Sequence, residues 1–223
     1  PAHNAARFVR EAIDSVLEDA DASATEVQVM VVDDASTDHT ADVVAKHGDP
    51  RVQLFRQTHL GSGLARNAGM ALTNSTWIGH LDADDIWLPG RIACLLGPLR
   101  KDPSLQAAFG RTVEFADGAP ANVRVRTEPV ASRMATAGIV RRDAYDRIGG
   151  YHAEPQFDQF EWSTRAVSSG LRYLAVDDVV LRRRIHMTNK SHNTADQAGI
   201  RLRALRAARV RARQPRTDGE SSS

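Results

Sequence analysis

The chain has 223 residues, of which 42% are hydrophobic and 26% are charged. This length and this balance are those of one soluble globular domain with a substantial core. No stretch approaches the roughly 18 consecutive apolar residues that span a bilayer. The only cysteine, Cys94, excludes an internal disulfide framework and a cysteine-based zinc site, and it fits a reducing compartment.

The net charge of +1 conceals an uneven distribution along the chain. Seven of the 29 basic residues but only two of the 28 acidic residues lie beyond residue 199, so residues 1–199 carry a formal charge of −4 and the remainder +5. Because the body of the chain is mildly acidic, we predict that it does not bind nucleic acid.

Helices and strands alternate regularly in the first hundred residues. Apolar residues at helical spacing predict a helix after Asn4, its expected N-cap, and continuous apolar runs predict buried parallel strands. The expected order is a helix to about residue 18, a strand over 27–32, a helix from Ser36 or Thr37 to 47, a strand over 51–55, a helix from 61, a strand from 77 and a helix from Pro89. This alternation predicts a parallel, doubly wound α/β sheet.

The pattern changes after Pro103. The later elements that we expect are strands over 105–109, 112–115, 172–176 and 179–185, and helices over 142–148 and 158–168. An Arg-rich helix over 193–213 and a disordered end should follow. The predicted parts of the chain are therefore residues 1–103, residues 104–195 and a basic tail of residues 196–223.

A doubly wound half normally begins with a buried strand before its first helix. Pro1 stands where such a strand would already have ended, so we expect the complete fold to include a strand before Pro1. Without it, backbone groups of the neighbouring strand would be left unpaired, and restoring it should raise thermal stability.

Two of the predicted strands end in acidic residues. Asp33 and Asp34 end one strand, and Asp82, Asp84 and Asp85 end another. Because the carboxyl ends of parallel strands meet at one edge of a sheet, we expect these side chains to share a cleft. Crowded carboxylates repel one another unless a cation relieves them, and Mg²⁺ or Mn²⁺ suits carboxylate and phosphate oxygens. Either acidic end alone is better explained as a solvated or capping turn, whereas the pair favours a binding site.

Four segments resemble, in order, the successive blocks of family 2 glycosyltransferases: Pro1–Asn4, Val31–Asp38, Gly63–Gly69 and Leu81–Asp85. The resemblance covers about residues 1–195, although Ala35 stands where the family usually has glycine. It implies the α/β fold of GT-A type, with a Rossmann-like, mostly parallel central sheet flanked by helices and a small mixed acceptor-side region. It also implies transfer of a sugar from a nucleoside diphosphate sugar, expected to be a UDP-sugar, to an acceptor hydroxyl with inversion.

The resemblance gives residues 1–103 the role of a donor half and residues 104–195 that of an acceptor side. The donor-binding residues that it implies are Pro1, His3, Asp33, Asp34, Arg66, Asp82, Arg184 and His186. Pro1 and His3 would line the nucleobase pocket, and Arg184 and His186 would lie over the diphosphate. Asp82 and Asp84 match the family's Asp-x-Asp motif and, with His186, would hold the Mn²⁺ or Mg²⁺ ion. Asp84 is the favoured direct ligand.

Inverting transfer also needs a general base that takes the proton of the acceptor hydroxyl. The family carries this Asp at the start of a helix, and the present sequence matches at Asp158 and Trp162, with Phe157 where the family has Glu. Asp158 is therefore the predicted base; a helix N-cap is its other interpretation, and Glu161 is the reserve candidate. The predicted acceptor-side residues are Gly150, Tyr151 and Trp162. A plain helix stop explains Gly150 equally well.

The tail carries six arginines between residues 201 and 213, with Leu202, Leu205 and Val210 between them. A basic amphipathic helix can lie on an anionic membrane surface or can simply be solvated. We expect a cytoplasmic protein, with weak peripheral association at the inner membrane face as the alternative.

Two other functions stay open. A sugar nucleotidyltransferase would share the acidic strand end and the metal, but it usually has a Gly-rich phosphate loop, which is absent near Pro1–Asn4. A non-catalytic nucleotide-sugar-binding protein would be compatible with Phe157. The sequence identifies neither the sugar nor the acceptor.

Overall fold

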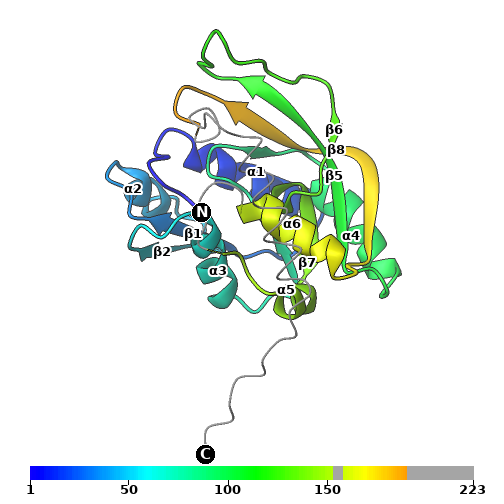
Figure 1. The fold of residues 1–223 in the computed structure, drawn as a ribbon. Helices are drawn as coiled ribbons and strands as arrows, with labels where there is room; N and C mark the ends of the chain where they lie inside the picture. The colour runs from blue at the N-terminus through cyan, green and yellow to red at the C-terminus, as the bar shows by residue number, and fades with distance from the viewer. Residues whose placement is uncertain (153–157, 190–223) are drawn as a thin grey trace, which may run out of the picture.

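Figure 1 shows the fold in a computed structural model, which describes residues 1–152 and 158–189. Its elements are α1 (Val9–Ala22), β1 (Val29–Asp34), α2 (Thr40–Ala45), β2 (Val52–Gln57), α3 (Ser62–Ala71), β3 (Trp77–Gly79), β4 (Ile86–Trp87), α4 (Arg91–Lys101), β5 (Ala107–Ala116), β6 (Val130–Ala131), η1 (Ala135–Ala137), β7 (Gly138–Arg141), α5 (Arg142–Ile148), α6 (Asp158–Ser168) and β8 (Tyr173–Ile185). Phe157 and the predicted tail helix lie outside the described residues. None of the described helices is both long and apolar enough to cross a bilayer.

The smaller of the two sheets consists of β1 and β2, which pair in parallel. Helix α1 covers it, and the buried side chains of Val9, Ile13 and Leu17 form one apolar cluster with Val31 and Val44. Helical spacing of the apolar residues in α1 is thus confirmed. Burial of each such side chain contributes roughly 1.5–3 kcal/mol, which holds the helix on the sheet.

The larger sheet has the strand order β3-β7-β5-β8-β4, with β6 beside β5. β5 and β8 pair in parallel, whereas the pairs β3–β7, β4–β8, β5–β6 and β5–β7 are antiparallel. The predicted α/β class is confirmed, and the described pairing is more mixed than the mostly parallel sheet that we expected. Both parallel pairs are joined by segments that contain helices, as parallel pairing requires.

β5 and β8 are long strands, where the sequence led us to expect two short ones in each place. The predicted strands over 105–109 and 112–115 merge into β5, with register shifts against β8 on either side of Arg111. A side chain at Gly110 would meet Val180 at 2.6 Å, so glycine allows the close approach of β8 there. In β8, the exposed pair Asp177 and Asp178 interrupts the apolar pattern without ending the strand.

Two predicted helix caps are wrong. Asn4 has a positive φ of 52°, and α1 begins only at Val9. The Asn4 side chain instead accepts a hydrogen bond from the Thr37 backbone N–H at 2.8 Å, which ties the start of the chain to the loop after β1. Helix α2 begins at Thr40, whose N–H donates to Asp38 at 2.9 Å, so Asp38 takes the role that we gave to Ser36 or Thr37.

A cavity of about 600 Å³ lies between the two sheets, lined by Val27, Val29 and Val31 on one side and by Trp77 and Leu81 on the other. At one end of β1, the Ala2 N–H donates to Val32 O, and the Asp34 N–H donates to Ala2 O, both at 2.8 Å. The strand expected before Pro1 stays a prediction.

Candidate active site

A second cavity, of about 740 Å³, opens where β1, the loop after β3 and the end of β8 meet. The predicted site residues that line it are Pro1, His3, Asp34, Arg66, Asp82, Asp84, Asp158 and His186. Residues far apart in the sequence therefore share one cleft, as the acidic strand ends led us to expect. Asp33, Arg184 and the three predicted acceptor-side residues are not part of its lining.

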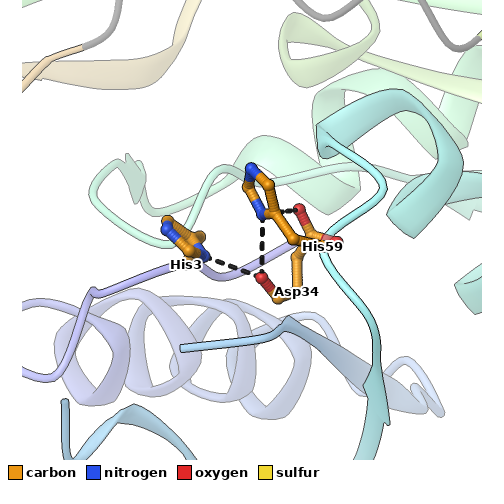
Figure 2. Close-up of side chains that lie close together, drawn as sticks. All are labelled: His3, Asp34 and His59. Atoms are coloured by element: carbon orange, nitrogen blue, oxygen red, sulfur yellow. Dashed lines mark hydrogen bonds and ion pairs between the residues drawn. The ribbon is translucent and has the colours of Figure 1, made fainter. Parts of the chain in front are cut away.

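Asp34 lies at the end of β1 between two histidines, as Figure 2 shows. The His3 and His59 rings lie 4.5 Å apart between centroids, and their Nδ1 atoms lie 2.7 and 3.1 Å from the backbone oxygen of Asp34. His59 Nδ1 also lies 3.0 Å from the Asp34 carboxylate. Two imidazole rings thus stand over the end of β1, and His59 is a residue that the sequence reasoning missed.

The Asp34 carboxylate is held by a loop. Its Oδ1 accepts hydrogen bonds from the Leu60 N–H and the Gln57 amide, both at 2.8 Å, and its Oδ2 accepts one from the Gly61 N–H at 2.9 Å. Burial alone would raise the pKa of Asp34, but these hydrogen bonds outweigh burial and place the pKa below its ordinary value. An ionised Asp34 therefore fixes the start of α3 against the end of β1.

Asp33 faces the other way, because successive residues of a strand point to opposite sides of the sheet. Its side chain is fully buried and accepts hydrogen bonds from Arg56 at 3.0 Å and from the Ser36 N–H at 3.1 Å. The structure therefore places Asp33 in a supporting position under the loop rather than in the cleft.

Arg66, in the first turns of α3, joins two acids in the cleft. Its Nη1 donates to Asp158 Oδ2 at 2.5 Å, and its Nη2 donates to Asp82 Oδ1. The Arg66 side chain is buried; burial alone would lower its pKa, but the charges of Asp82 and Asp158 outweigh that effect and keep the pKa raised. Burial would likewise raise the pKa of Asp82, and the charge of Arg66 lowers it overall. Arg66 and Asp82 are therefore ionised, and the Arg66 side chain orients Asp82 and Asp158 relative to each other.

Asp158 is the first residue of α6, and its two carboxylate oxygens have different surroundings. Oδ2 accepts hydrogen bonds from Arg66 and from the Ser62 hydroxyl, the latter at 3.0 Å. Oδ1 accepts one from the Gln159 N–H at 2.7 Å. Because a carboxylate oxygen has two lone pairs, Oδ1 keeps the capacity to accept a further proton.

Asp84 lies on the opposite wall, against the end of β8. Its Oδ2 lies 3.0 Å from His186 Nε2 and accepts a hydrogen bond from the Asn189 amide at 3.2 Å. A carboxylate oxygen and an imidazole nitrogen that converge in this way form a donor set that fits Mn²⁺ or Mg²⁺, with water and phosphate oxygens as further ligands. Asp82 has one oxygen on Arg66, so Asp84 and His186 offer the better-placed pair.

The three groups His3, Asp34 and His59 also offer ligand atoms within 4.8 Å of one another. However, four donors already surround the Asp34 carboxylate, and they are the groups that define the loop from Gln57 to Gly61. Within the part of the chain that the structure describes, Asp84 with His186 is therefore the pair better placed to hold a metal ion.

Arg184 does not face the cleft. Its guanidinium donates to Asp117 at 2.7 Å and to Glu11, and it lies between the rings of Phe8 and Phe115, 4.9 and 4.7 Å from their centroids. The neighbouring Arg183 lines the cavity in its place. The sequence contains three successive arginines at residues 182–184. Because successive side chains of β8 point to opposite faces of the sheet, the position in the strand decides which of them reaches the cleft.

Asp85 supports the same strand. It is buried, and its Oδ1 accepts a hydrogen bond from the Arg184 N–H at 2.8 Å. Burial and the charges of Asp84 and Asp82 raise its pKa well above the ordinary value. The acidic run after β3 thus brings Asp82, Asp84 and Asp85 to the cavity lining, and Asp85 is the buried one that also holds β8.

The predicted acceptor-side residues lie behind the cleft wall. Trp162 is fully buried, stacks on Tyr145 at 4.4 Å and donates to the Gly149 carbonyl at 2.9 Å. Tyr151 is also buried, and its backbone exchanges hydrogen bonds of 2.7 and 2.8 Å with the Asn67 side chain. A side chain at Gly150 would collide with that Asn67 at 2.4 Å. These residues position the wall, and their role toward an acceptor stays a prediction.

Glu161, the reserve base, is buried and paired with Arg165, whose guanidinium also donates to the carbonyls of Ile148 and Gly150. Its position in this structural pair leaves Asp158 as the acid of α6 that lines the cleft. Gln159, which approaches Asp82 at 3.4 Å, is a cleft residue that had no signal in the sequence.

The profile of glycosyl transferase family 2 matches residues 1–207. The chain belongs to glycosyl transferase family 2. A chondroitin synthase of Escherichia coli is 32% identical over 111 residues, which are 49% of this chain and 16% of that protein. The matched segment therefore covers about a sixth of the length of that protein.

Solved structures with the same fold include TarS residues 1–349 of S. aureus in complex with UDP-GlcNAc, with a TM-score of 0.74, 17% identity and coverage of 95% of this chain and 64% of that one. The mannosyltransferase PcManGT of Pyrobaculum calidifontis, in complex with GDP-Man and Mn²⁺, has a TM-score of 0.68, 21% identity and coverage of 100% and 64%. At these identities the likeness concerns the fold, and it places this family 2 chain among GT-A glycosyltransferases.

Proposed function

We propose that this chain transfers a sugar from a nucleoside diphosphate sugar to an acceptor hydroxyl, with inversion at the anomeric carbon and with the help of Mn²⁺ or Mg²⁺. The observation that carries the proposal is the convergence of Asp34, Asp84 with His186, and Asp158 on one cavity. The neighbouring structures that contain UDP-GlcNAc, and GDP-Man with Mn²⁺, support a nucleotide-sugar donor of this kind.

In this proposal the donor lies across residues 1–103. His3 and Asp34 receive the nucleoside, and Asp84 and His186 hold the metal, which when bound would neutralise charge on the diphosphate. Arg183, at the cleft wall, adds a guanidinium on the same side, and its charge lowers the pKa of Asp82. Preorganised positive charge at a leaving group is an effective source of transition-state stabilisation.

The acceptor approaches from residues 104–195, and Asp158 takes its proton. Arg66 and Ser62 hold Oδ2, so Oδ1 accepts the proton as the hydroxyl oxygen forms its bond to the anomeric carbon and the bond from that carbon to the diphosphate oxygen breaks. Arg66 also binds Asp82, so one side chain sets the position of the base relative to the donor side. The chondroitin synthase relative supports polysaccharide assembly as the process. A cytoplasmic location and contact of residues 196–223 with a membrane stay predictions.

Isothermal titration of UDP, GDP, ADP and CDP, with and without Mn²⁺, tests the donor site. We expect one nucleoside diphosphate to bind at micromolar concentration and to lose at least tenfold in affinity without the metal. Asp84→Ala should remove the metal-dependent part, whereas the matched control Asp42→Ala, on the exposed side of α2, should keep it. If none of the four binds to the wild-type protein, the donor-site assignment fails.

A further inference from the structure

The segment of residues 117–129, between β5 and β6, forms one wall of the cleft. In Figure 1 it is drawn in green and rises away from the two sheets. Its residues Val123, Arg124 and Arg126 line the same cavity as Asp84 and Asp158. The segment therefore belongs to the site, although nothing in the proposed donor chemistry uses it.

Backbone and side-chain hydrogen bonds fix this wall at Glu114 of β5. The Glu114 N–H donates to Arg126 O at 2.7 Å, and the Arg126 N–H donates to Glu114 Oε2 at 2.9 Å. The other oxygen of Glu114 accepts from Arg183 at 3.1 Å. Glu114 is thus occupied by a backbone N–H and by Arg183, and it leaves the guanidinium groups of Arg124 and Arg126 uncompensated.

Arg124 and Arg126 are exposed, and neither forms an ion pair with an acid among residues 1–152 and 158–189. Some other described arginines are paired, such as Arg51 with Asp49 and Arg165 with Glu161, whereas others, such as Arg10, form no ion pair within the described residues. Arg124 and Arg126 differ from Arg10 because they line the cavity. The cavity rim on the acceptor side therefore carries two positive charges that the described part of the protein does not neutralise.

The two walls of the cleft differ in charge. The part of the cleft formed by β1, the loop after β3 and the start of α6 presents Asp34, Asp82, Asp84 and Asp158, which suit a metal and hydroxyl groups. The opposite rim presents Arg124 and Arg126, which bind carboxylate or phosphate in bidentate fashion and attract anions from a distance. Positive charge on the acceptor side favours an acceptor that carries negative charge.

We propose that the acceptor carries acid groups, carboxylate or phosphate, and that Arg124 and Arg126 bind one of them while the acceptor hydroxyl reaches Asp158. This inference rests on the proposed function, because it assigns the acceptor of the same site. Arg124 and Arg126 act as specificity residues: they contact the acceptor away from the bond that forms, and they leave the nucleotide untouched.

The test compares three probes by isothermal titration without added divalent ions: a hexamer of galacturonic acid, its fully methyl-esterified form, and an oligomer of glycerol phosphate. We expect at least one acidic probe to bind at least tenfold more tightly than the neutral ester. The double variant Arg124→Gln/Arg126→Gln should remove that preference. The control Arg10→Gln/Lys101→Gln, which removes the same charge from exposed positions elsewhere, should keep it.

The nucleotide titration with Mn²⁺ separates this inference from the proposed function. We expect the Arg124→Gln/Arg126→Gln variant to bind the preferred nucleoside diphosphate within twofold of wild type. The inference is overturned if the wild type binds neither acidic probe. It is also overturned if the acidic and esterified hexamers bind equally well and the phosphate oligomer does not bind. A tenfold loss of nucleotide affinity in the double variant would also overturn it, because the arginines would then serve the donor.

Discussion

The guanidinium of Arg66 lies 2.5 Å from the carboxylate of Asp158, and the same side chain binds Asp82. One buried cation thus connects the proposed base on α6 with the acidic strand end after β3, although the two acids are 76 residues apart in the printed sequence. Removal of this cation leaves two acids that face each other in a partly buried cleft.

Arg66→Ala should therefore lower the free energy of unfolding by about 3 kcal/mol, because breaking a buried ion pair from one side leaves uncompensated charge. Urea denaturation at pH 7 measures this loss. Arg10→Ala, at an exposed position of α1, is the control and should change stability by less than about 0.5 kcal/mol. A loss below about 1 kcal/mol in Arg66→Ala would contradict the assigned ion pairs.

Ala35 has a φ of 59°, in the left-handed region where residues with a Cβ atom are strained by roughly 1–2 kcal/mol. It follows Asp34 at the turn out of β1, where the family usually has glycine. Ala35→Gly should raise the free energy of unfolding by up to about 1 kcal/mol once the greater backbone entropy of glycine is deducted. Ala41→Gly, inside α2, should lower it by about 1 kcal/mol. Equal destabilisation by both changes would exclude the strain.

Asp34→Asn tests the loop that surrounds the carboxylate in Figure 2. At pH 7 the variant should lose about 2 kcal/mol, because an amide cannot accept from all the donors that Asp34 satisfies. The pKa of Asp34 lies below 3.8 in the folded protein, so its stabilisation is complete above about pH 3.8 and is lost as the pH falls through the lower, folded value. The difference between variant and wild type should shrink over that window in urea titrations; a difference that grows toward acid pH would contradict the direction of the shift.

Trp162→Phe separates support of the cleft wall from contact with substrate. The change removes a hydrogen bond to Gly149 and part of a fully buried ring, so we expect a loss of about 2 kcal/mol in stability. Nucleotide affinity at 10 °C should stay within twofold of wild type, because Trp162 does not line the cavity. A tenfold loss of nucleotide affinity in a folded variant would place Trp162 in the site instead.

Strongly periodic or motif-bearing parts of the chain were predictable. Helices over 142–148 and 158–168 match α5 and α6, and the acidic ends of two strands do share a cleft. The start of α1 was not predictable from local chemistry: Asn4 looks like an N-cap, but its side chain binds the loop at Thr37 instead. A tertiary contact between two loops overrides the local preference there.

Within the site, the differences between the expected and the observed cavity lining arise from the alternation of side chains along strands. Asp33 and Asp34 are chemically equal in the sequence, as are Arg183 and Arg184, yet only one of each pair lines the cavity. Which one does depends on strand register, and register is set by pairing with β2 and β5, far away in the sequence. The sequence also does not distinguish an aromatic side chain that contacts a ligand from one that packs in the core behind the cleft, as Trp162 and Tyr151 do.

We propose that Asp158 removes the acceptor proton while Asp84 and His186 serve the donor. Release of nucleoside diphosphate from a panel of UDP- and GDP-sugars with Mn²⁺, with water or an added acceptor, tests it most directly in wild type and Asp158→Asn. We expect donor affinity within threefold of wild type and release at least 100-fold slower in the variant, because a general base typically contributes a factor of this size. Equal release rates in the two proteins would contradict it.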